Sequence, residues 1–234
     1  MNGKAFFIDQ SRCTACRGCQ VACKQWKKLP ATTTVNTGSY QNPPQVDGHT
    51  LKIVHFSEAV IGGKLRWLFF PEQCRHCLNP PCKIAADAAL PGAITQDAET
   101  GAVIYNESTK ELDYRAIRSA CPYDIPRKNP ETGTLVKCNM CIDRVQAGME
   151  PACVKTCPSH VMHFGDLTVM TALARKRLDE LRPANAGVLV ADAGFVRVLY
   201  LCEYDPSYYY QHMTRGVPDS DSPFIGRRAL LGLR

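Results

Sequence analysis

Four closely spaced cysteines near the start of the chain constrain its fold more than any other feature. Cys13, Cys16, Cys19 and Cys23 follow the pattern C-x2-C-x2-C-x3-C. In bacterial-type ferredoxins, three cysteines of such a run bind one [4Fe–4S] cluster and the fourth binds a second cluster. Zinc also uses C-x2-C, but as two separated pairs around one ion. The run therefore predicts iron–sulfur clusters, with zinc as the alternative.

The remaining cysteines extend this pattern along the chain. There are 13 cysteines in 234 residues, an odd number that favours metal ligands over a disulfide scaffold. Twelve of them sort into three trios and three singles. The trios are Cys13/Cys16/Cys19, Cys74/Cys77/Cys82 and Cys138/Cys141/Cys153, and the singles are Cys23, Cys121 and Cys157. The last, Cys202, lies in a strand-like segment and is expected to be a buried free thiol.

In a pair of such motifs, the single cysteine of each motif binds the cluster held by the trio of the other motif. If this rule holds here, the spacing predicts which cysteines share a cluster. Pairing the first motif with the last, and the middle two with each other, completes three sets. These sets are Cys13/Cys16/Cys19/Cys157, Cys138/Cys141/Cys153/Cys23 and Cys74/Cys77/Cys82/Cys121. A fourth set would need cysteines where the chain has Ala86, Glu111, Tyr114 and Ile117. We therefore expect a four-cluster plan reduced to three [4Fe–4S] clusters.

The elements between the cysteine loops predict an α+β fold of two interleaved bacterial-ferredoxin-like modules, with short strands, hairpins and helices. Strands are expected at residues 4–9, 51–56, 64–70, 92–95, 102–105, 161–164, 188–191 and 195–199, and helices at 19–28, 110–120 and 167–181. Residues 1–30 and 132–166 would hold two clusters, and residues 66–131 one. Residues 31–65 would be an inserted loop and strands, and residues 167–234 a C-terminal helix, hairpin and tail.

The formal net charge of +6 does not by itself indicate a nucleic-acid partner. Each cluster with its thiolates contributes about −2, so three clusters would nearly cancel this charge. No secretory signal is expected at the N-terminus. The most apolar late stretch, residues 187–204, is interrupted by Asp192, Arg197 and Glu203, so no transmembrane segment is expected. Arg227 and Arg228 are expected to lie in a solvated tail.

Several charged residues lie within two positions of a predicted ligand. They are Arg17, Lys24, Arg75, Lys137 and Lys155. They are candidates for raising cluster potentials, but most are expected to be solvated. His76 is expected to be a surface or hydrogen-bonding residue. The sequence contains no recognisable hydrolytic triad, phosphate-binding loop or nicotinamide fingerprint, so catalysis by this chain alone is not expected.

The nested plan resembles that of the four-cluster ferredoxin subunits that serve molybdopterin oxidoreductases. The segments RCTACRGCQVACKQW (residues 12–26), ACPYDIP (120–126) and KCNMC (137–141) are similar to the iron–sulfur (beta) subunit of tungsten- or molybdenum-dependent formate dehydrogenase. The similarity is greatest to the soluble heterodimeric type of sulfate-reducing bacteria, and it covers about residues 4–204. Membrane-bound members differ in having a fourth cluster and a C-terminal transmembrane helix.

The resemblance implies a non-catalytic electron-transfer subunit. A large catalytic partner would carry the tungsten or molybdenum bis-pterin cofactor, and a soluble acceptor such as a multihaem c-type cytochrome would receive the electrons. It also implies a periplasmic complex, exported with the partner, with a cytoplasmic location as the alternative. Two other functions stay open: the electron-transfer subunit of a polysulfide, nitrate or dimethyl sulfoxide reductase, and a zinc-stabilised interaction module.

Overall fold

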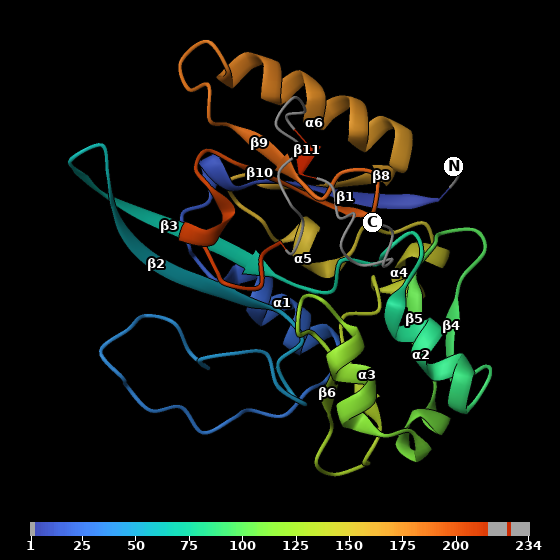
Figure 1. The fold of residues 1–234 in the computed structure, drawn as a ribbon. Helices are drawn as coiled ribbons and strands as arrows, with labels where there is room; N and C mark the ends of the chain where they lie inside the picture. The colour runs from blue at the N-terminus through green and yellow to red at the C-terminus, as the bar shows by residue number, and fades with distance from the viewer. Residues whose placement is uncertain (1–2, 215–223, 226–234) are drawn as a thin grey trace.

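The structure is a computed structural model, and it describes residues 3–214 and 224–225. A five-stranded sheet in the order β11–β9–β10–β1–β8 lies at its centre (Figure 1). Its strands are β1 (Lys4–Asp9), β8 (Met162–Asp166), β9 (Leu189–Ala191), β10 (Val198–Cys202) and β11 (Phe224–Ile225). Strand β1 pairs in parallel with β10 and antiparallel with β8, so the two ends of the sequence meet in one sheet.

One helix covers one face of this sheet, and the cysteine-bearing elements lie on the other side (Figure 1). Helix α6 (Leu167–Leu181) buries Leu167, Met170, Ala174 and Leu178, which recur at helical spacing. Below the sheet lie α1 (Gly18–Trp26), α4 (Ile142–Gln146) and α5 (Ala152–Lys155), and α1 packs against α5. This packing brings the first and last cysteine motifs together.

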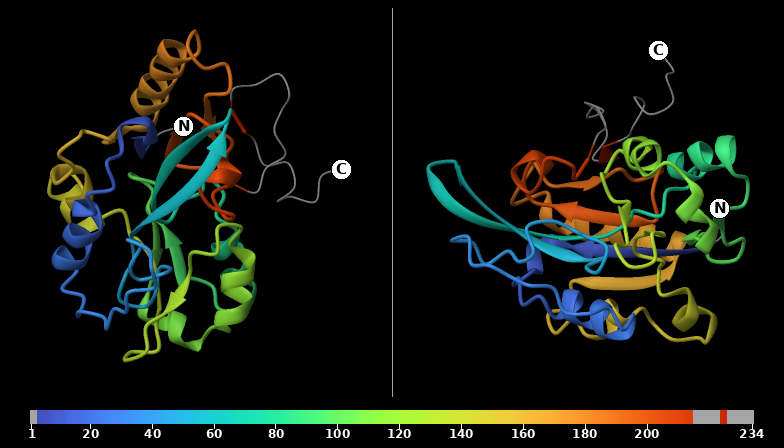
Figure 2. Two further views of the ribbon diagram at one scale, coloured as in Figure 1. Left: turned by 90° about the vertical axis from the view of Figure 1, so that its left-hand side faces the viewer. Right: turned by 90° about the horizontal axis from the view of Figure 1, so that it is seen from below.

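A long hairpin projects from the body of the molecule (Figures 1 and 2). It consists of β2 (Ile53–Ile61) and β3 (Lys64–Glu72), both longer than the sequence predicts. Gly62 and Gly63 form its turn with positive φ angles of 58° and 75°, the geometry that a two-residue turn between twisted strands requires. The inner half is buried, and it leads directly into Cys74.

The middle of the sequence forms a separate lobe with its own apolar core, drawn mainly in green in Figure 1. Its elements are α2 (Pro81–Ala89), β4 (Ile94–Gln96), β5 (Val103–Tyr105), η2 (Glu107–Glu111), α3 (Tyr114–Ala120), β6 (Arg127–Lys128) and β7 (Leu135–Val136). Helix α2 packs against α3, and β4 pairs antiparallel with β5 in the predicted hairpin. The α+β class predicted from the sequence is confirmed.

Two further expected elements differ in more than their bounds. The single helix at 110–120 is instead a 3-10 turn ending at Glu111 and an α-helix starting at Tyr114, because the Asp113 side chain accepts the backbone N–H of Arg115 and caps α3. The strand at 195–199 starts only at Val198. Its first residues are bound elsewhere, since the Phe195 carbonyl accepts the Leu78 N–H.

Residues 206–214, which belong to the predicted C-terminal tail, are folded. Residues Pro206–Tyr208 form the 3-10 turn η3, and the Tyr209 and Met213 side chains are buried in the core. Arg227 and Arg228 lie outside the described residues. Within residues 3–214 and 224–225, no helix has the length and apolar character needed to cross a membrane.

Candidate iron–sulfur cluster sites

The same backbone turn occurs in all three cysteine trios. The residue before the second cysteine has a positive φ in each: Ala15 at 53°, His76 at 45° and Met140 at 63°. Residues other than glycine rarely adopt a positive φ, so the surrounding structure imposes this turn. It aims backbone N–H groups at sulfur, as His76 N donates to Cys74 Sγ at 3.4 Å and Met140 N to Cys138 Sγ at 3.4 Å. Such bonds stabilise the thiolate form that binds metal.

A second turn is repeated after two of the single cysteines. Cys121 and Cys157 are each followed by proline, and the residue three positions later has a positive φ: 53° at Asp124 and 49° at His160. The Val161 N–H then donates to Cys157 Sγ at 3.3 Å. The chain therefore repeats the same turn after both of these cysteines.

The structure brings the four cysteines of the first predicted set around one cavity, which they line together with Val54 and Met162 among others. These cysteines are Cys13, Cys16, Cys19 and Cys157. Cys16 is exposed while Cys19 is buried, so this site reaches the surface on one side. Burial raises the pKa of Cys19 to about 11. A thiolate in that position needs nearby positive charge, which bound iron would supply.

The second set joins α1 to the last motif. Burial raises the pKa of Cys23 well above its ordinary value, and the neighbouring sulfurs of Cys138, Cys153 and Cys141 raise it further. Of these four residues, only Cys138 has appreciable exposure. Cys23 is one helical turn from Cys19 on α1, yet the sulfurs that raise the pKa of Cys23 differ from those that raise the pKa of Cys19. The structure therefore separates the fourth cysteine of the run from the first three.

The third set surrounds a cavity in the middle lobe. Its cysteines are Cys74, Cys77, Cys82 and Cys121. The prolines at 80 and 81 form part of the wall, and Pro81 also starts α2, where its missing N–H costs no helical hydrogen bond. Burial raises the pKa of Cys121 to about 12. Cys77 and Cys121 are partly exposed, so this site also approaches the surface.

The second set has neighbours in both of the other sets. The Cys19 sulfur of the first set raises the pKa of Cys153 in the second, after the larger effect of burial. In the same way, Cys74 of the third set acts on Cys138 of the second. The second set is therefore in the middle and the most buried, while the first and third form the two ends.

Two buried donors fit the presence of sulfide clusters beside these cysteines. Gln73 Nε2 and His76 Nε2 have no hydrogen-bond partner in the part of the chain that the structure describes, and both residues are fully buried next to Cys74. His76 Nδ1 accepts the Val103 N–H at 3.0 Å, which leaves the proton of the neutral ring on Nε2. Inorganic sulfide would be an acceptor for such donors. The hydrogen-bonding interpretation of His76 holds, but its side chain is not at the surface.

The cations near the ligands divide into buried and solvated groups. Lys155 is exposed, and Arg17 and Lys24 are partly exposed. Arg75 and Lys137 are buried, contrary to a solvated role. The Arg75 guanidinium lies over three aromatic rings, 4.4 Å from the centre of the Tyr200 ring in the closest case. Lys137 Nζ donates to the Val103 carbonyl at 2.5 Å and lines the third cavity.

Sequence spacing missed one buried cation, Lys52. It is far from every cysteine in the sequence, in a segment that reads only as the start of a strand. In the structure its Nζ donates to Gln73 Oε1 at 2.5 Å. Burial lowers the pKa of Lys52, but the sulfurs of Cys153 and Cys19 raise it above its ordinary value. A tertiary contact of this kind leaves no local signal.

The position of the absent fourth set is filled by side chains. Ala86 and Ile117 are buried where α2 faces α3, together with Leu112. Tyr114 packs against the same core, and its hydroxyl accepts a hydrogen bond from Arg118 at 3.1 Å. Glu111 is exposed at the end of its 3-10 turn. These four residues therefore offer no common ligand geometry for a metal centre.

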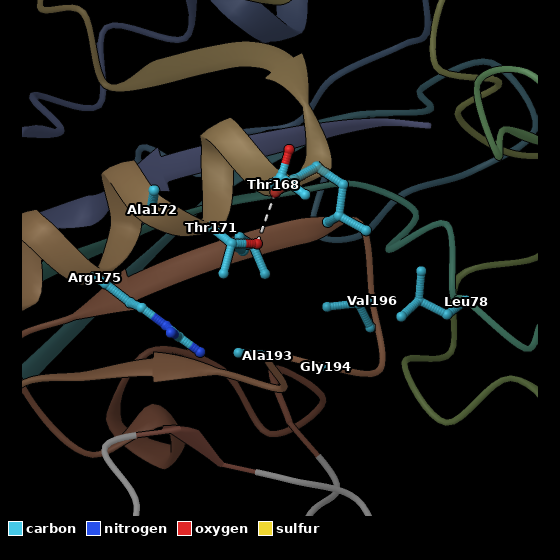
Figure 3. Close-up of a pocket in the computed structure, with 10 residues that line it drawn as sticks. Leu78, Thr168, Thr171, Ala172, Arg175, Ala193, Gly194 and Val196 are labelled. Carbon is cyan, nitrogen blue, oxygen red and sulfur yellow. Dashed lines mark hydrogen bonds between the residues drawn. The ribbon is translucent and has the colours of Figure 1, made fainter. Parts of the chain in front are cut away.

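Cys202 and one open pocket lie apart from the cysteine sets. Cys202 is a buried free thiol on β10, as predicted, and its Sγ donates to Gln10 Oε1 at 3.1 Å. The pocket, of about 550 Å³, lies between α6 and the loop that joins β9 to β10. Figure 3 shows Thr168, Thr171 and Arg175 of α6 facing Gly194 across it. No cysteine lines it, so it is not part of the cluster sites.

The geometry defines a ferredoxin-like protein built to hold iron–sulfur clusters, and comparison with known families agrees. A family model described as a 4Fe-4S dicluster domain matches residues 65–167. The chain is 51% identical over 210 residues to the formate dehydrogenase subunit beta of Megalodesulfovibrio gigas, covering 89% of this chain and 98% of that protein.

Two further relatives place the chain more narrowly. It is 49% identical over 213 residues to formate dehydrogenase 2 subunit beta (cytochrome c-553) of Nitratidesulfovibrio vulgaris, covering 89% of this chain and 97% of that protein. It is 37% identical over 222 residues to the formate dehydrogenase-O iron-sulfur subunit of Escherichia coli, covering 92% of this chain and 71% of that protein. The chain belongs to the family of formate dehydrogenase beta subunits. This family assignment supports iron–sulfur clusters over the zinc alternative.

Proposed function

We propose that this chain carries three [4Fe–4S] clusters and relays electrons between the catalytic subunit of a formate dehydrogenase and an external acceptor. The observation that carries the proposal is the group of three four-cysteine sets in a member of this family. When bound, the clusters supply one-electron carriers. The residues of the chain would hold them, exclude water from the most buried one and place buried charge beside them.

The ligand sets are part of this proposal. They are Cys13/Cys16/Cys19/Cys157, Cys138/Cys141/Cys153/Cys23 and Cys74/Cys77/Cys82/Cys121. For the first and third sets, the support is that the four cysteines of each set line one cavity. For the second set, the support is that the other three cysteines raise the pKa of Cys23, in addition to the larger effect of burial. Iron and acid-labile sulfide of about twelve each per chain, on protein purified without oxygen, are the expected result. About sixteen of each would require a fourth cluster.

The interleaved modules are likewise proposed. Residues 1–30 with 132–166 would hold two clusters and residues 66–131 one, because α1 packs against α5 and α2 against α3. Residues 31–65 would be the inserted loop and strands, although β3 continues to Glu72, and residues 167–234 would be the C-terminal helix, hairpin and tail.

The partners follow from the family. We propose a heterodimer with a large catalytic subunit that carries the tungsten or molybdenum bis-pterin cofactor. The proposed acceptor is a soluble one, such as the multihaem c-type cytochrome that the resemblance implies, and the name of one relative includes a c-type cytochrome, cytochrome c-553. Periplasmic location, with export on the partner, fits such an acceptor.

Activity of the complex tests this assignment. Formate oxidation releases carbon dioxide, one proton and two electrons, and each oxidised viologen takes one electron. The complex purified with its native partner should reduce two viologens per formate. Activity on polysulfide, nitrate or dimethyl sulfoxide without activity on formate would instead make the chain a subunit of another molybdopterin oxidoreductase.

A further inference from the structure

The Tyr105 side chain ends in a buried hydroxyl for which the described residues supply no hydrogen-bond partner. Tyr105 is the last residue of β5, and its side chain packs against the core of the middle lobe. Val103, two residues earlier, lies on the same side of the strand, and both residues line the cavity of the third cysteine set. Gln73 and His76 also have a buried donor of this kind, but neither of them lines this cavity.

The chemistry expected inside this cavity supplies the missing acceptor. A buried hydroxyl without a partner costs free energy, so native proteins rarely leave one unpaired. Tyr105 shares its cavity with Cys74, Cys77, Cys82 and Cys121. A cluster bound by these thiolates would place cysteine sulfur and inorganic sulfide in the cavity, and both accept hydrogen bonds. The phenolic hydroxyl keeps its proton at neutral pH and can donate it in such a bond.

Lys137 holds the Tyr105 ring in place. Its ammonium lies over the ring, with Nζ 4.7 Å from the ring centre. The same Nζ donates to the Val103 carbonyl at 2.5 Å and to the Cys138 carbonyl at 3.1 Å. These two backbone contacts fix the ammonium, and its attraction to the ring face fixes the ring. The chain itself therefore sets the orientation of the Tyr105 side chain.

A second tyrosine, Tyr123, lines the same cavity and provides a contrast. The Arg75 guanidinium lies 4.7 Å from the centre of the Tyr123 ring, the same distance as between Lys137 and the Tyr105 ring. The Tyr123 hydroxyl, however, donates to Asp192 Oδ2 at 2.8 Å. Of the two tyrosines, it is Tyr105 whose hydroxyl is left for an acceptor within the cavity, as far as the described residues go.

We propose that the Tyr105 hydroxyl donates a hydrogen bond to a sulfur of the third cluster and raises the reduction potential of that cluster alone. The inference rests on the proposed function. Reduction adds one electron to a cluster and makes its sulfurs more negative, so a hydrogen bond to them is stronger in the reduced form. The hydroxyl keeps its proton in both forms, and only the electron moves. Removing the hydroxyl must therefore lower the potential.

Potentiometric titration monitored by electron paramagnetic resonance tests this role on the full chain with its clusters. Tyr105→Phe keeps the ring and removes only the hydroxyl. We expect one of the three one-electron transitions to fall, with at least a threefold change in the reduction equilibrium, or about 28 mV. It should be the transition that Cys82→Ser, which changes a ligand of the third set, also alters. The other two transitions should stay in place within this limit.

The matched control is Tyr123→Phe. It removes a hydroxyl from a residue of the same cavity, but one that bonds Asp192, so it should lower stability and move no transition beyond this limit. The role of Tyr105 is wrong if Tyr105→Phe moves no transition, raises one, moves a different one from Cys82→Ser, or moves all three equally. An equal shift in both tyrosine variants would also overturn it, because packing rather than the Tyr105 hydroxyl would then set the potential.

Pulsed electron paramagnetic resonance in deuterated solvent gives a second, independent test of the hydrogen bond. The reduced wild-type protein should show an exchangeable deuteron coupled to the third cluster that is absent from Tyr105→Phe. Identical spectra for the two proteins would overturn the inference. Failure of the proposed function looks different, because wild-type protein would lack about twelve iron per chain and show no cluster signals at all.

Discussion

Cys19 and Cys23 are only one helical turn apart on α1, but their sulfur neighbours differ, and this difference gives the sharpest test of the ligand sets. Burial raises the pKa of both thiols, and the sulfurs that raise it further are those of Cys13 and Cys157 for Cys19 and that of Cys138 for Cys23. Cys23→Ala should therefore damage the second cluster and leave the first intact. Iron should fall from about twelve per chain by between about one and four, depending on whether the cluster loses one iron or is lost whole.

Double variants separate this arrangement from the alternative in which neighbours in sequence share a cluster. Cys23→Ala combined with Cys138→Ala should lose little more iron than either alone, because both act on one cluster. Cys19→Ala combined with Cys23→Ala should lose about the sum of the two single effects. Cys202→Ala is the matched control, since its buried thiol bonds only protein groups in the described structure and its loss should remove no iron. An additive Cys23/Cys138 pair, or a non-additive Cys19/Cys23 pair, would refute the assignment.

Three further outcomes are expected from the middle lobe. Ile117→Ala opens a cavity in a fully packed core and should lower the free energy of unfolding by about 2–5 kcal/mol in anaerobic denaturation. Tyr123→Phe removes the buried 2.8 Å hydrogen bond to Asp192 and should cost about 1.5–3 kcal/mol in the same assay. Burial alone would raise the pKa of Asp124, but Arg118 lowers it below its ordinary value. The ionised Asp124 carboxylate therefore stabilises the fold above about pH 4, and this stabilisation is lost as the pH falls through the lower folded pKa. The difference in free energy of unfolding between wild type and Asp124→Asn should shrink on acidification. A constant difference across pH would contradict that reasoning.

The sequence predicted elements best where one strong pattern decides the structure. The strand Lys4–Asp9 and the helix Leu167–Leu181 have the predicted bounds, because an apolar strand and an amphipathic helix each follow from local periodicity. The sheet order could not be predicted, since β1 pairs in parallel with β10 almost the whole length of the chain away. The burial of Lys52 could not be predicted for the same reason, because it depends on a contact with Gln73, which is distant in the sequence.

The cysteine sets show how far spacing alone can reach. Counting along the chain proposed three sets, and the structure brings the same cysteines together, although their iron content is still a prediction. The charges beside them were harder to predict, because burial depends on packing from distant segments. Arg75 and Lys155 both lie next to ligand motifs, yet one is enclosed by aromatic rings and the other is exposed.

The filled space between α2 and α3 explains how the chain remains well packed without the fourth set of cysteines. Replacing cluster ligands alone would leave a void lined by apolar groups, at a cost of about 24 cal/mol per Å³. Here the small Ala86 lets α2 approach α3, and Ile117 and Leu112 occupy the interior. Glu111, at the remaining ligand position, turns to solvent. With no fourth cysteine set beside it, the third set is the last sulfur-lined site in the middle lobe. Its partly exposed cysteines, Cys77 and Cys121, are where this site approaches the surface.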